Sequence, residues 1–517
     1  MSLPGLELTQ PSDERQNVVA PPSQINLTPG SEWRFEVAFG HSIKVKLLTG
    51  TAEIFGTELA ESQTYTFSGA KAAIYSWHGC ELEVSAGETH TATFDGVTPT
   101  AGHGAGGCQS EYVSEETPMV EYANAHFALE SMREETQDSG KDGPRVLLLG
   151  PDNAGKTSVA KILTAYATKV GRQPIVVNLD PNEGCSVYLE LLPQRLFEPC
   201  WMLKRPSRWG WICLSSDCVT TGAVCYGSHG RDEDSRETGI IVDTPGILSS
   251  GKPGTLELIN HIVTEFAITT IMVLGSERLY SNMVKQYDNK PSASASADAF
   301  DERIAVVKLS KSGGCVDRDA AFLKTAREFQ IKSYFFGTSI ISPSPTAITL
   351  SPHTSQLDFA ALSVYNYTVT SADDEDEDEY DPSQLSMGDS FSPSNGGDNY
   401  NPAESDRAAP LPGIVGLSVD PASSAGDLSG SSKVPLKKVL PPAPTALANT
   451  LLAITHAPTT ATPAQVRDAS IIGFLYVASV EPDKGKIHVL APVGGRVPQR
   501  AMIWAKRWPD EVIGLVN

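Results

Sequence analysis

The chain has 517 residues, of which 40% are hydrophobic, and its formal net charge is −22 at pH 7. A chain of this length is too long for a single hydrophobic core, and it predicts about two to four domains. Twelve acidic residues and no basic ones fall between Asp373 and Asp406, so about half of the excess charge lies in one segment. The rest of the sequence is mildly acidic, which excludes a broad basic surface for duplex nucleic acid.

The sequence carries no sign of a secretory or membrane protein. The N-terminal residues have neither a basic start nor an apolar core, so we expect no signal peptide. The longest apolar runs fall far short of the ~20 residues that a membrane helix needs. Eight cysteines without a CxxC pair indicate the reduced thiols of an intracellular protein. Five of them lie between Cys185 and Cys225, where the spacings match no usual zinc site and leave zinc as the minor alternative.

The first third of the chain predicts a β domain. Residues 1–25 are polar and rich in proline, and we expect a disordered tail there. From Trp33 onward apolar residues alternate in short runs broken by glycine, as in "WRFEVAFG", which predicts an all-β sandwich or barrel over residues 26–112. Residues 113–140 are predicted to be a linker.

Residues 141–340 predict an α/β domain with a parallel sheet. Apolar strands alternate with helices in this part of the chain, which is typical of a sheet covered on both faces. The predicted strands are residues 145–149, 174–180, 239–246, 269–275 and 304–309.

Residues 341–517 predict a small C-terminal α+β domain, built from segments such as "LANTLLAITHA" and "IIGFLYVASVE". An acidic insert at residues 371–435 interrupts it. The insert has too few apolar residues to order itself, so we expect disorder, with an acidic partner-binding patch as the alternative.

The stretch "GPDNAGKTS" matches the phosphate-binding P-loop pattern, with an apolar strand before it and an amphipathic helix after it. Backbone N–H groups of such a loop and the positive end of the helix bind phosphate oxygens. In this pattern Lys156 reaches the β- and γ-phosphates and Thr157 binds Mg²⁺, whereas a chance glycine-rich turn is the weaker alternative. The predicted nucleotide-binding residues of this loop are Asp152, Asn153, Ala154, Gly155, Lys156, Thr157 and Ser158.

Two aspartates end predicted strands of the same sheet. Asp180 and Asp243 are expected at its carboxyl edge, where ligands bind in open α/β folds. Either could hold the metal through water or act as a base on an attacking hydroxyl, while a simple capping or turn role is the alternative. The motif "DTPG" around Asp243 also suits a GTPase, but the only Asn-Lys pair, Asn289-Lys290, precedes Pro-Ser and lacks the aspartate that binds guanine.

Several motifs in order resemble the eukaryotic polynucleotide 5′-hydroxyl kinase family, and most closely its fungal branch, the ATP-binding subunits of pre-mRNA cleavage factor IA. They are "TAEIFGTEL", "GPDNAGKTS", "NLDPNEG", "GIIVDTPG", "LGSERLY", "VVKLSKSGGCVDRD" and "GFLYV". The resemblance implies the same three domains, with the N-terminal domain capping the nucleotide. By motif position it implies that Glu32 and Lys71 contact adenine.

The resemblance also implies that the acceptor side is altered. Active relatives carry Asp-Val-Gly-Gln after the second strand, whereas this chain has Asp180 followed by Pro181, Asn182 and Glu183. Proline changes the path of the loop, and Glu183 opposes an approaching RNA phosphate. The family's lid keeps Arg318, but Leu323 stands at about the place where active relatives have a second arginine. Lys324 or Arg327 nearby is the alternative source of that positive charge.

Residues 185–238 match nothing in the family and form a shorter stretch than its usual insertion. Trp201, Trp209 and Trp211 beside "KRPSR" allow an RNA-stacking patch. A misread stretch of gene is the interpretation that the composition favours.

These features together predict an ATP-binding structural subunit of the mRNA 3′-end cleavage and polyadenylation complex. The subunit is expected to hold ATP with Mg²⁺ and not to hydrolyse or transfer the nucleotide's phosphate. The implied partners are the large scaffold subunit of factor IA that reads the polymerase II C-terminal tail, and other processing subunits. RNA is expected only within the complex, no membrane is expected, and the location is the nucleus. The alternative is an enzyme, an ATP-dependent RNA 5′-hydroxyl kinase that uses Lys156, Thr157, Asp180 and Arg318.

Overall fold

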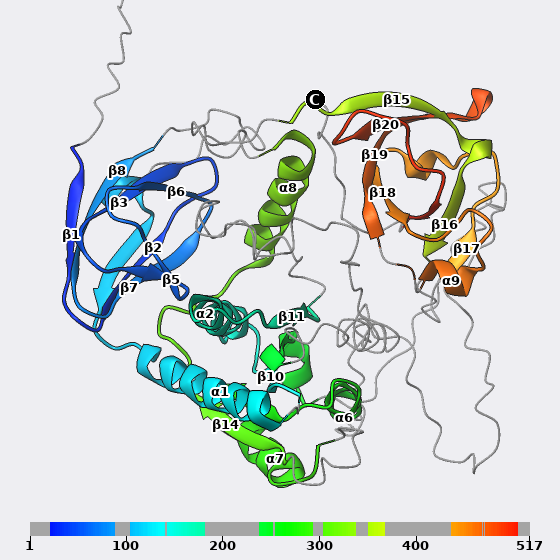
Figure 1. Cartoon of the computed structure of the whole chain (residues 1–517). Coiled ribbons are helices and arrows are strands. Elements are labelled where there is room, and N and C mark those ends of the chain that lie inside the picture. Colours follow the sequence, from blue (N-terminus) through cyan, green and yellow to red (C-terminus); the bar gives the residue numbers. More distant parts are fainter. Residues whose placement is uncertain are drawn as a thin grey trace, which may run out of the picture.

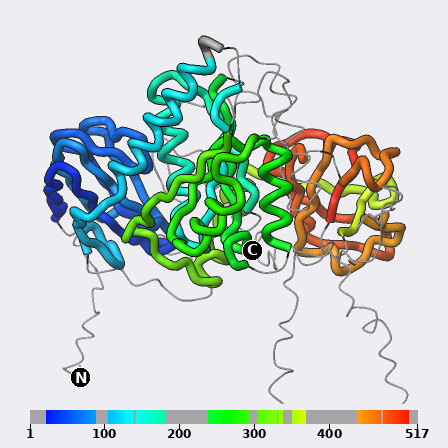
Figure 2. Tube along the Cα trace, turned by 90° about the horizontal axis from the view of Figure 1, so that it is seen from below, coloured from blue at the N-terminus to red at the C-terminus, as the bar shows by residue number. Residues whose placement is uncertain are grey.

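The computed structural model describes residues 21–87, 104–139, 142–180, 237–251, 254–292, 303–337, 350–367, 436–467, 469 and 471–504. They form an N-terminal β domain, a central α/β domain and a C-terminal domain, with the central domain between the other two in Figure 2. The acidic insert, residues 185–236 and the predicted tail up to residue 20 lie outside the described residues.

The N-terminal domain is a sandwich of two antiparallel sheets, which decides between the two predicted β folds (Figure 1). One sheet has the order β1-β8-β3-β6 and the other β5-β4-β7-β2-β9. Their strands are β1 (Ser23–Leu27), β2 (Ser31–Glu36), β3 (Ser42–Gly50), β4 (Glu53–Ile54), β5 (Thr57–Glu58), β6 (Thr64–Ser68), β7 (Lys71–Ser76), β8 (Cys80–Ala86) and β9 (Ser110–Ser114).

Strand β2 is buried on both of its faces, which is unusual for an antiparallel sheet with one solvated side. Trp33 and Phe35 point into the sandwich core, where their rings stack with centroids 4.5 Å apart. The alternate residues Glu32 and Arg34 are also buried. They belong to the opposite face of the strand, which lies against the central domain.

The predicted linker contains a long helix, α1 (Met119–Ser139). Tyr122 and Leu129 of this helix are buried in a core cluster that they share with the central domain. This stretch therefore differs from a free linker, because its apolar side chains cover part of the central sheet.

The central sheet has the order β11-β12-β10-β13-β14, and all its strands are parallel, as predicted. Helices α1 and α2 cover one face and helices α6 and α7 cover the other. The bounds are β10 (Arg145–Leu149), α2 (Lys156–Lys169), β11 (Ile175–Asn178), β12 (Ile240–Asp243), α6 (Thr255–Glu265), β13 (Thr270–Leu274), α7 (Glu277–Tyr287) and β14 (Ala305–Leu309).

The C-terminal domain has a seven-stranded sheet with the order β15-β20-β19-β18-β21-β16-β17. Only the β16–β21 pair is parallel among these described strands. The bounds are β15 (His353–Asp358), β16 (Ser363–Tyr367), β17 (Leu436–Lys438), β18 (Thr450–Thr455), α9 (Pro463–Arg467), β19 (Ile471–Glu481), β20 (Lys486–Ala491) and β21 (Ala501–Trp504).

Helix α8 (Ala320–Phe336) connects the two outer domains, and it lies between them in Figure 1. In its first turn and its middle, the rings of Phe322 and Phe329 lie 5.1 and 5.8 Å from the ring of Phe39 in the sandwich. Near its end, the fully buried Phe335 packs in a cluster with Leu451, Tyr476 and Leu490 of the C-terminal sheet. One helix thus contacts both domains.

No helix in the described ranges combines the length and the apolar character that a bilayer crossing requires.

Candidate nucleotide-binding site

The P-loop joins β10 to α2 and has the backbone conformation that phosphate binding requires. Asn153 and Gly155 have φ values of +55° and +89°, and α2 begins directly afterwards at Lys156. Left-handed residues of this kind turn successive N–H groups toward one point, to which the helix adds its positive end. Ala154 is fully buried in the core cluster that contains residues of α1, α2 and the central sheet, so it anchors the loop there.

Lys156 and Thr157 hold different positions at the first turn of α2. The Lys156 ammonium is nearly buried and donates a hydrogen bond of 2.8 Å to the carbonyl oxygen of Pro151, so it lies across the loop. The Thr157 hydroxyl donates a hydrogen bond of 2.6 Å to the buried carboxylate of Asp243. The structure therefore brings together the two residues predicted as Mg²⁺ ligands. Their hydroxyl and carboxylate oxygens are the ligand types that Mg²⁺ prefers, so the donor set fits this ion.

Asp180 lies at the same edge of the sheet as Asp243. Strands β11 and β12 are in register with Asn178 opposite Asp243, and the Leu179 N–H donates to the Asp243 carbonyl oxygen at 2.9 Å. The Asp180 N–H in turn donates to the Asn178 side chain at 2.7 Å. Asp180 is therefore at the carboxyl edge, and the altered loop from Pro181 onward lies outside the described residues.

Residues 310–319, which we call the lid segment, run from the end of β14 to the start of α8. Helix α1 holds its first residue. The Glu121 carboxylate accepts hydrogen bonds of 2.9 Å from both the N–H and the hydroxyl of Ser310. The Tyr122 hydroxyl donates a hydrogen bond of 2.7 Å to the Ser310 carbonyl oxygen. All three polar groups of Ser310 are thereby bound to α1.

The sandwich contacts the middle of the lid segment through Arg34. Its guanidinium pairs with Glu32 at 2.5 Å and lies over the Tyr112 ring, 5.4 Å from the centroid. It also packs on two glycines of the lid segment, because a Cβ added at Gly314 would lie 2.8 Å from Arg34 Nε. Burial raises the pKa of Glu32, an effect that the positive charge of Arg34 partly offsets. Glu32 therefore forms a buried ion pair with Arg34 at the interface between the sandwich and the lid segment.

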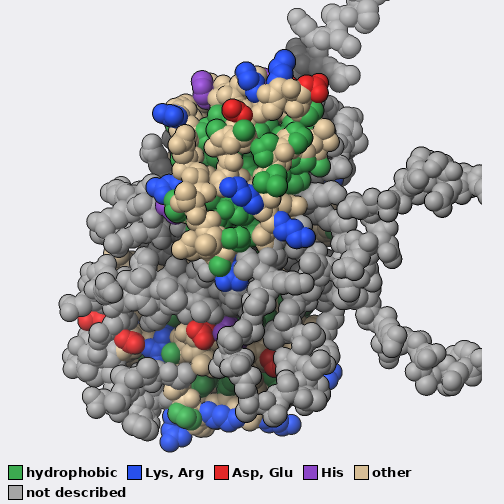
Figure 3. Space-filling model, turned by 90° about the vertical axis from the view of Figure 1, so that its right-hand side faces the viewer, with side chains coloured by type: hydrophobic (Ala, Val, Ile, Leu, Met, Phe, Trp, Pro, Cys, Tyr) green, Lys and Arg blue, Asp and Glu red, His purple; other side chains and the backbone are tan. Residues whose placement is uncertain are grey.

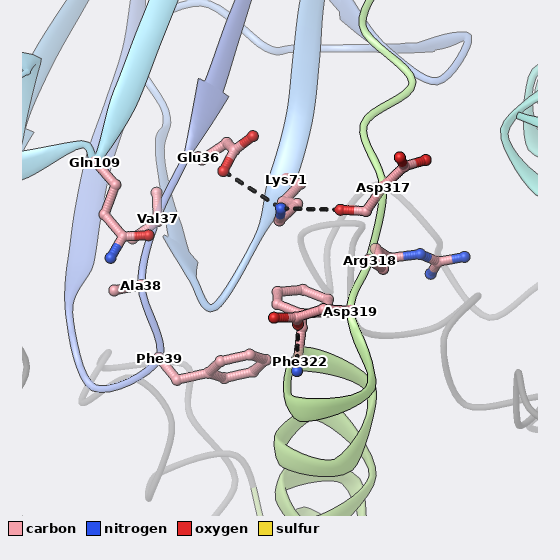
Figure 4. Close-up of a pocket in the computed structure, with 10 residues that line it drawn as sticks. All are labelled: Glu36, Val37, Ala38, Phe39, Lys71, Gln109, Asp317, Arg318, Asp319 and Phe322. Atoms are coloured by element: carbon pink, nitrogen blue, oxygen red, sulfur yellow. Dashed lines mark hydrogen bonds and ion pairs between the residues drawn. The ribbon is translucent and has the colours of Figure 1, made fainter. Parts of the chain in front are cut away.

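Lys71 joins the sandwich to the far end of the lid segment (Figure 4). Its ammonium lies 3.4 Å from the Glu36 carboxylate, 3.5 Å from the Asp317 carbonyl oxygen and over the ring of Phe322. The Asp317 carboxylate accepts a hydrogen bond of 3.3 Å from Asn153 of the P-loop. Asp317 consequently lies between the two predicted nucleotide contacts, Lys71 and Asn153.

A cavity of about 380 Å³ opens beside Lys71, between the sandwich and the start of α8. Arg318 is among its lining residues, but its guanidinium points away from Lys71 in Figure 4. Phe39 and Phe322 form its apolar side. Asp317, Arg318 and Asp319 of the lid segment line this cavity.

The remaining predicted residues of the loop are placed as follows. Asp152 is exposed and lies against Gly246, where an added Cβ would be 2.1 Å from its carboxylate. Ser158 is half-buried in the first turn of α2. Within the described ranges, no group of three or more His, Cys, Asp or Glu residues could hold a metal, and the five clustered cysteines lie outside these ranges.

Four residues that shape this site are not predicted from the sequence, namely Arg34, Glu121, Tyr122 and Cys315. The Cys315 thiol lies directly against the P-loop, since a Cβ added at Gly155 would be 2.6 Å from its sulfur. Only Arg34 had a sequence signal, because it shares a strand face with Glu32 at a spacing of two. The other contacts join residues more than 150 positions apart.

The GTPase alternative finds no support in the geometry. Asn289 and Lys290 follow the end of α7, and the Asn289 N–H donates to the carbonyl oxygen of Ile304, just before β14 begins. The amino ends of parallel strands lie at the edge opposite the P-loop. This Asn-Lys pair is therefore too far from the nucleotide-binding edge to read a base.

Comparisons with known proteins agree with the three domains. Family models match residues 26–136 as the N-terminal β-sandwich domain of polyadenylation factor and residues 216–337 as the mRNA cleavage and polyadenylation factor CLP1 P-loop. The second match begins inside residues 185–238, so the expectation that this stretch matches nothing in the family is wrong for residues 216–238. A third model, the pre-mRNA cleavage complex II protein Clp1, matches residues 350–510.

Two solved structures share this fold, each with a TM-score of 0.64. One is described as a complex of wild-type Clp1p and a fragment of Pcf11p, with 23% identity over 93% of this chain and 96% of that one. The other is described as an extended interface between Pcf11p and Clp1p and the basis of ATP loss in a point mutant. It has 22% identity over 93% of this chain and 97% of that one.

Two fungal proteins named mRNA cleavage and polyadenylation factor clp1 are 60% identical over the full length of both chains, from Neosartorya fischeri and Aspergillus oryzae. The alignment with the Neosartorya fischeri protein spans 568 positions, 51 more than this chain has residues, so that relative has residues without a counterpart here. The prediction that residues 185–238 account for part of this shortfall remains untested. The chain belongs to the Clp1 family of mRNA cleavage and polyadenylation factors.

Proposed function

We propose that this chain is an ATP-holding structural subunit of the machinery that cleaves and polyadenylates pre-mRNA 3′ ends. One observation carries the proposal: the lid segment contacts the P-loop, the sandwich and α1 at once, and then continues into α8. A nucleotide at the P-loop would therefore touch parts of several domains. Its chief effect would be to fix their relative orientation and offer partners one composite surface.

The described residues fit ATP with Mg²⁺. The N–H groups of the P-loop and the start of α2 would bind the phosphates, with Lys156 leaving the Pro151 carbonyl for a phosphate oxygen. Thr157 and Asp243 would hold the metal, directly or through water, and the metal would neutralise phosphate charge. Glu32 and Lys71 are the proposed adenine contacts. Binding to the folded state alone would stabilise it by about 4 kcal/mol at a ligand concentration of ~1,000 times Kd.

The alternative function is an RNA 5′-hydroxyl kinase. Asp180 shares the sheet edge with Asp243, and Arg318 belongs to the lid segment, so a base and a cation are present near the P-loop. Against this stands the acceptor loop, in which Pro181 and Glu183 replace the residues of active relatives. We therefore propose that ATP is held and not transferred.

The relatives support a proposal for the partner and the location. The structurally similar Clp1p chains are complexed with Pcf11p. We propose that this chain likewise binds the large scaffold subunit that reads the polymerase II C-terminal tail, acts with other 3′-end processing subunits, meets RNA only within that complex, and works in the nucleus.

The test is to incubate the purified protein with ATP labelled at the γ-phosphate, Mg²⁺ and a 5′-hydroxyl RNA, followed by gel filtration. We expect intact ATP to remain with the protein and the RNA to stay unlabelled, and Lys156→Ala to lose the retained nucleotide. RNA that becomes labelled by the intact protein but not by Lys156→Ala would overturn the structural role in favour of the kinase.

A further inference from the structure

The two ends of the C-terminal sheet differ in charge. The strand registers place the ends of β18 and β20, the starts of β16 and β21 and the end of β17 at one end of the sheet. Residues 438–444 continue from the end of β17 and residues 492–500 join β20 to β21 at this end, and we call the two segments the basic end. Their charged residues are Lys438, Arg496 and Arg500, which are all exposed, and neither segment contains Asp or Glu.

The opposite end, which carries the β19–β20 turn, is mixed in charge. Asp358, Glu481 and Asp483 lie there with Lys484 and Lys486. Glu481 pairs with Lys484 at 3.0 Å and contacts His488 at 2.9 Å, so much of this charge is compensated locally. The positive charge of the basic end has no such compensation from acidic residues in its own two segments. Over the C-terminal domain in Figure 3, Lys and Arg side chains lie beside and around apolar side chains.

The basic end also exposes large apolar side chains. Leu440 and Val493 are 73% and 71% exposed, the highest fractions among the large hydrophobic residues that the structure describes. Cations around exposed aliphatic side chains suit a ligand that is acidic and also carries apolar residues. No exposed aromatic side chain is present in residues 438–444 or 492–500. Base stacking on aromatic rings is a main source of affinity for single-stranded RNA, so this composition favours an acidic peptide.

Such a segment is part of the same chain. Residues 373–391 contain nine Asp or Glu and no Lys or Arg, together with Tyr380, Leu385, Met387 and Phe391. They belong to the insert between β16 and β17, whose ends, Tyr367 and Leu436, are paired neighbours in the sheet. We propose that residues 373–391 bind to the basic end of the C-terminal domain of the same molecule.

The tether allows this contact. Tyr367 lies at the end of β16 that is remote from the basic end, and the five residues of β16 span about 16 Å. The six residues from Tyr367 to Asp373 extend up to about 20 Å, so the acidic run can reach the basic end. Attachment at both ends keeps the segment at an effective concentration on the order of millimolar, which makes even weak ion pairs sufficient for binding.

The experiment uses the intact chain and a deletion variant in which a short Gly/Ser/Asn linker replaces residues 370–434. Fluorescence anisotropy of a labelled synthetic peptide of residues 373–391 is measured at low salt. We expect the peptide to bind the deletion variant at least about tenfold more tightly than the intact chain, because the tethered copy competes in the intact chain. Binding should weaken as salt rises.

Matched substitutions in the deletion variant locate the contact. Lys438→Glu with Arg496→Glu should weaken peptide binding about tenfold, while Lys484→Glu with Lys486→Glu at the opposite end should change it less than about twofold. Circular dichroism checks that both variants fold; the comparison of intact and deleted chains needs neither substitution. Equal binding to the intact and deleted chains, or an equal loss in both charge-reversal pairs, would overturn the proposal. So would an unlabelled single-stranded RNA that binds the same end more tightly than the peptide.

Discussion

A methyl group added at Gly155 would press against the lid segment. Gly155 has a φ of +89°, a conformation that costs an L-residue about 1–2 kcal/mol. The added Cβ would also lie 2.6 Å from the Cys315 sulfur, well inside the contact distance of about 3.5–4 Å. Overpacking of this kind costs about 1–3 kcal/mol, so Gly155→Ala should weaken the closed arrangement of P-loop and lid segment by about 2–5 kcal/mol.

A double-mutant cycle separates the two costs. Cys315→Ala removes the sulfur but leaves the backbone of Gly155→Ala strained. The double variant should therefore recover about 1–3 kcal/mol of the loss, which is the coupling between the two positions. The assay is the ATP dissociation constant measured by equilibrium dialysis with labelled ATP, where 1.4 kcal/mol equals a tenfold change.

The chain offers a matched control at the other end of α2. Gly171 has a φ of +85°, and an added Cβ there meets no atom within 4 Å. Gly171→Ala carries the same backbone cost without a steric contact, and it should show no coupling to Cys315→Ala. If the effects of Gly155→Ala and Cys315→Ala on ATP affinity simply add, the lid segment does not lie against the P-loop, and the reasoning is refuted.

Three further predictions follow from other contacts. Phe335→Ala should destabilise the attachment of α8 to the C-terminal sheet by about 3–5 kcal/mol, since the ring is fully buried; hydrogen exchange should accelerate there and not in the sandwich. Burial raises the pKa of Glu53 above its ordinary value of 4.5, so the folded protein releases this proton at a higher pH than the unfolded chain does. The free energy of unfolding should therefore fall as the pH rises from 4.5 through the folded-state pKa. Glu53→Gln should flatten this decline in melting temperature above pH 4.5, whereas the exposed Glu61→Gln should not. Tyr122→Phe removes one hydrogen bond to Ser310, worth about 1 kcal/mol, and should speed ATP release about fivefold in a filter-binding chase; an unchanged rate would show that α1 does not position the lid segment.

The parts of this molecule that the sequence predicts are those encoded locally. The P-loop, its flanking strand and helix, and the alternation of Trp33 and Phe35 depend on residues close in sequence, and the structure confirms each of these elements. Helix α1 was missed because its apolar side chains do not keep to one face, with Val120 and Phe127 exposed, and because its stability depends on the face of the sheet that it covers. Contacts between distant segments, such as Cys315 with the P-loop, have no local pattern at all.

The packing also indicates which part of the site a nucleotide would position. The sandwich is joined to α2 by apolar packing: Tyr75 is buried in the core cluster that contains Leu163, and a Cβ at Gly56 would lie 3.1 Å from the Cβ of Ala165. The lid segment is held instead by polar contacts near its ends, at Ser310 and Asp317, and by the packing of its glycines on Arg34. Polar contacts at a partly exposed interface contribute less than tight apolar packing, so the lid segment needs the nucleotide more than the sandwich does. Because α8 continues directly from this segment and reaches the C-terminal sheet, we expect the arrangement of the outer domains to change with nucleotide binding at the P-loop.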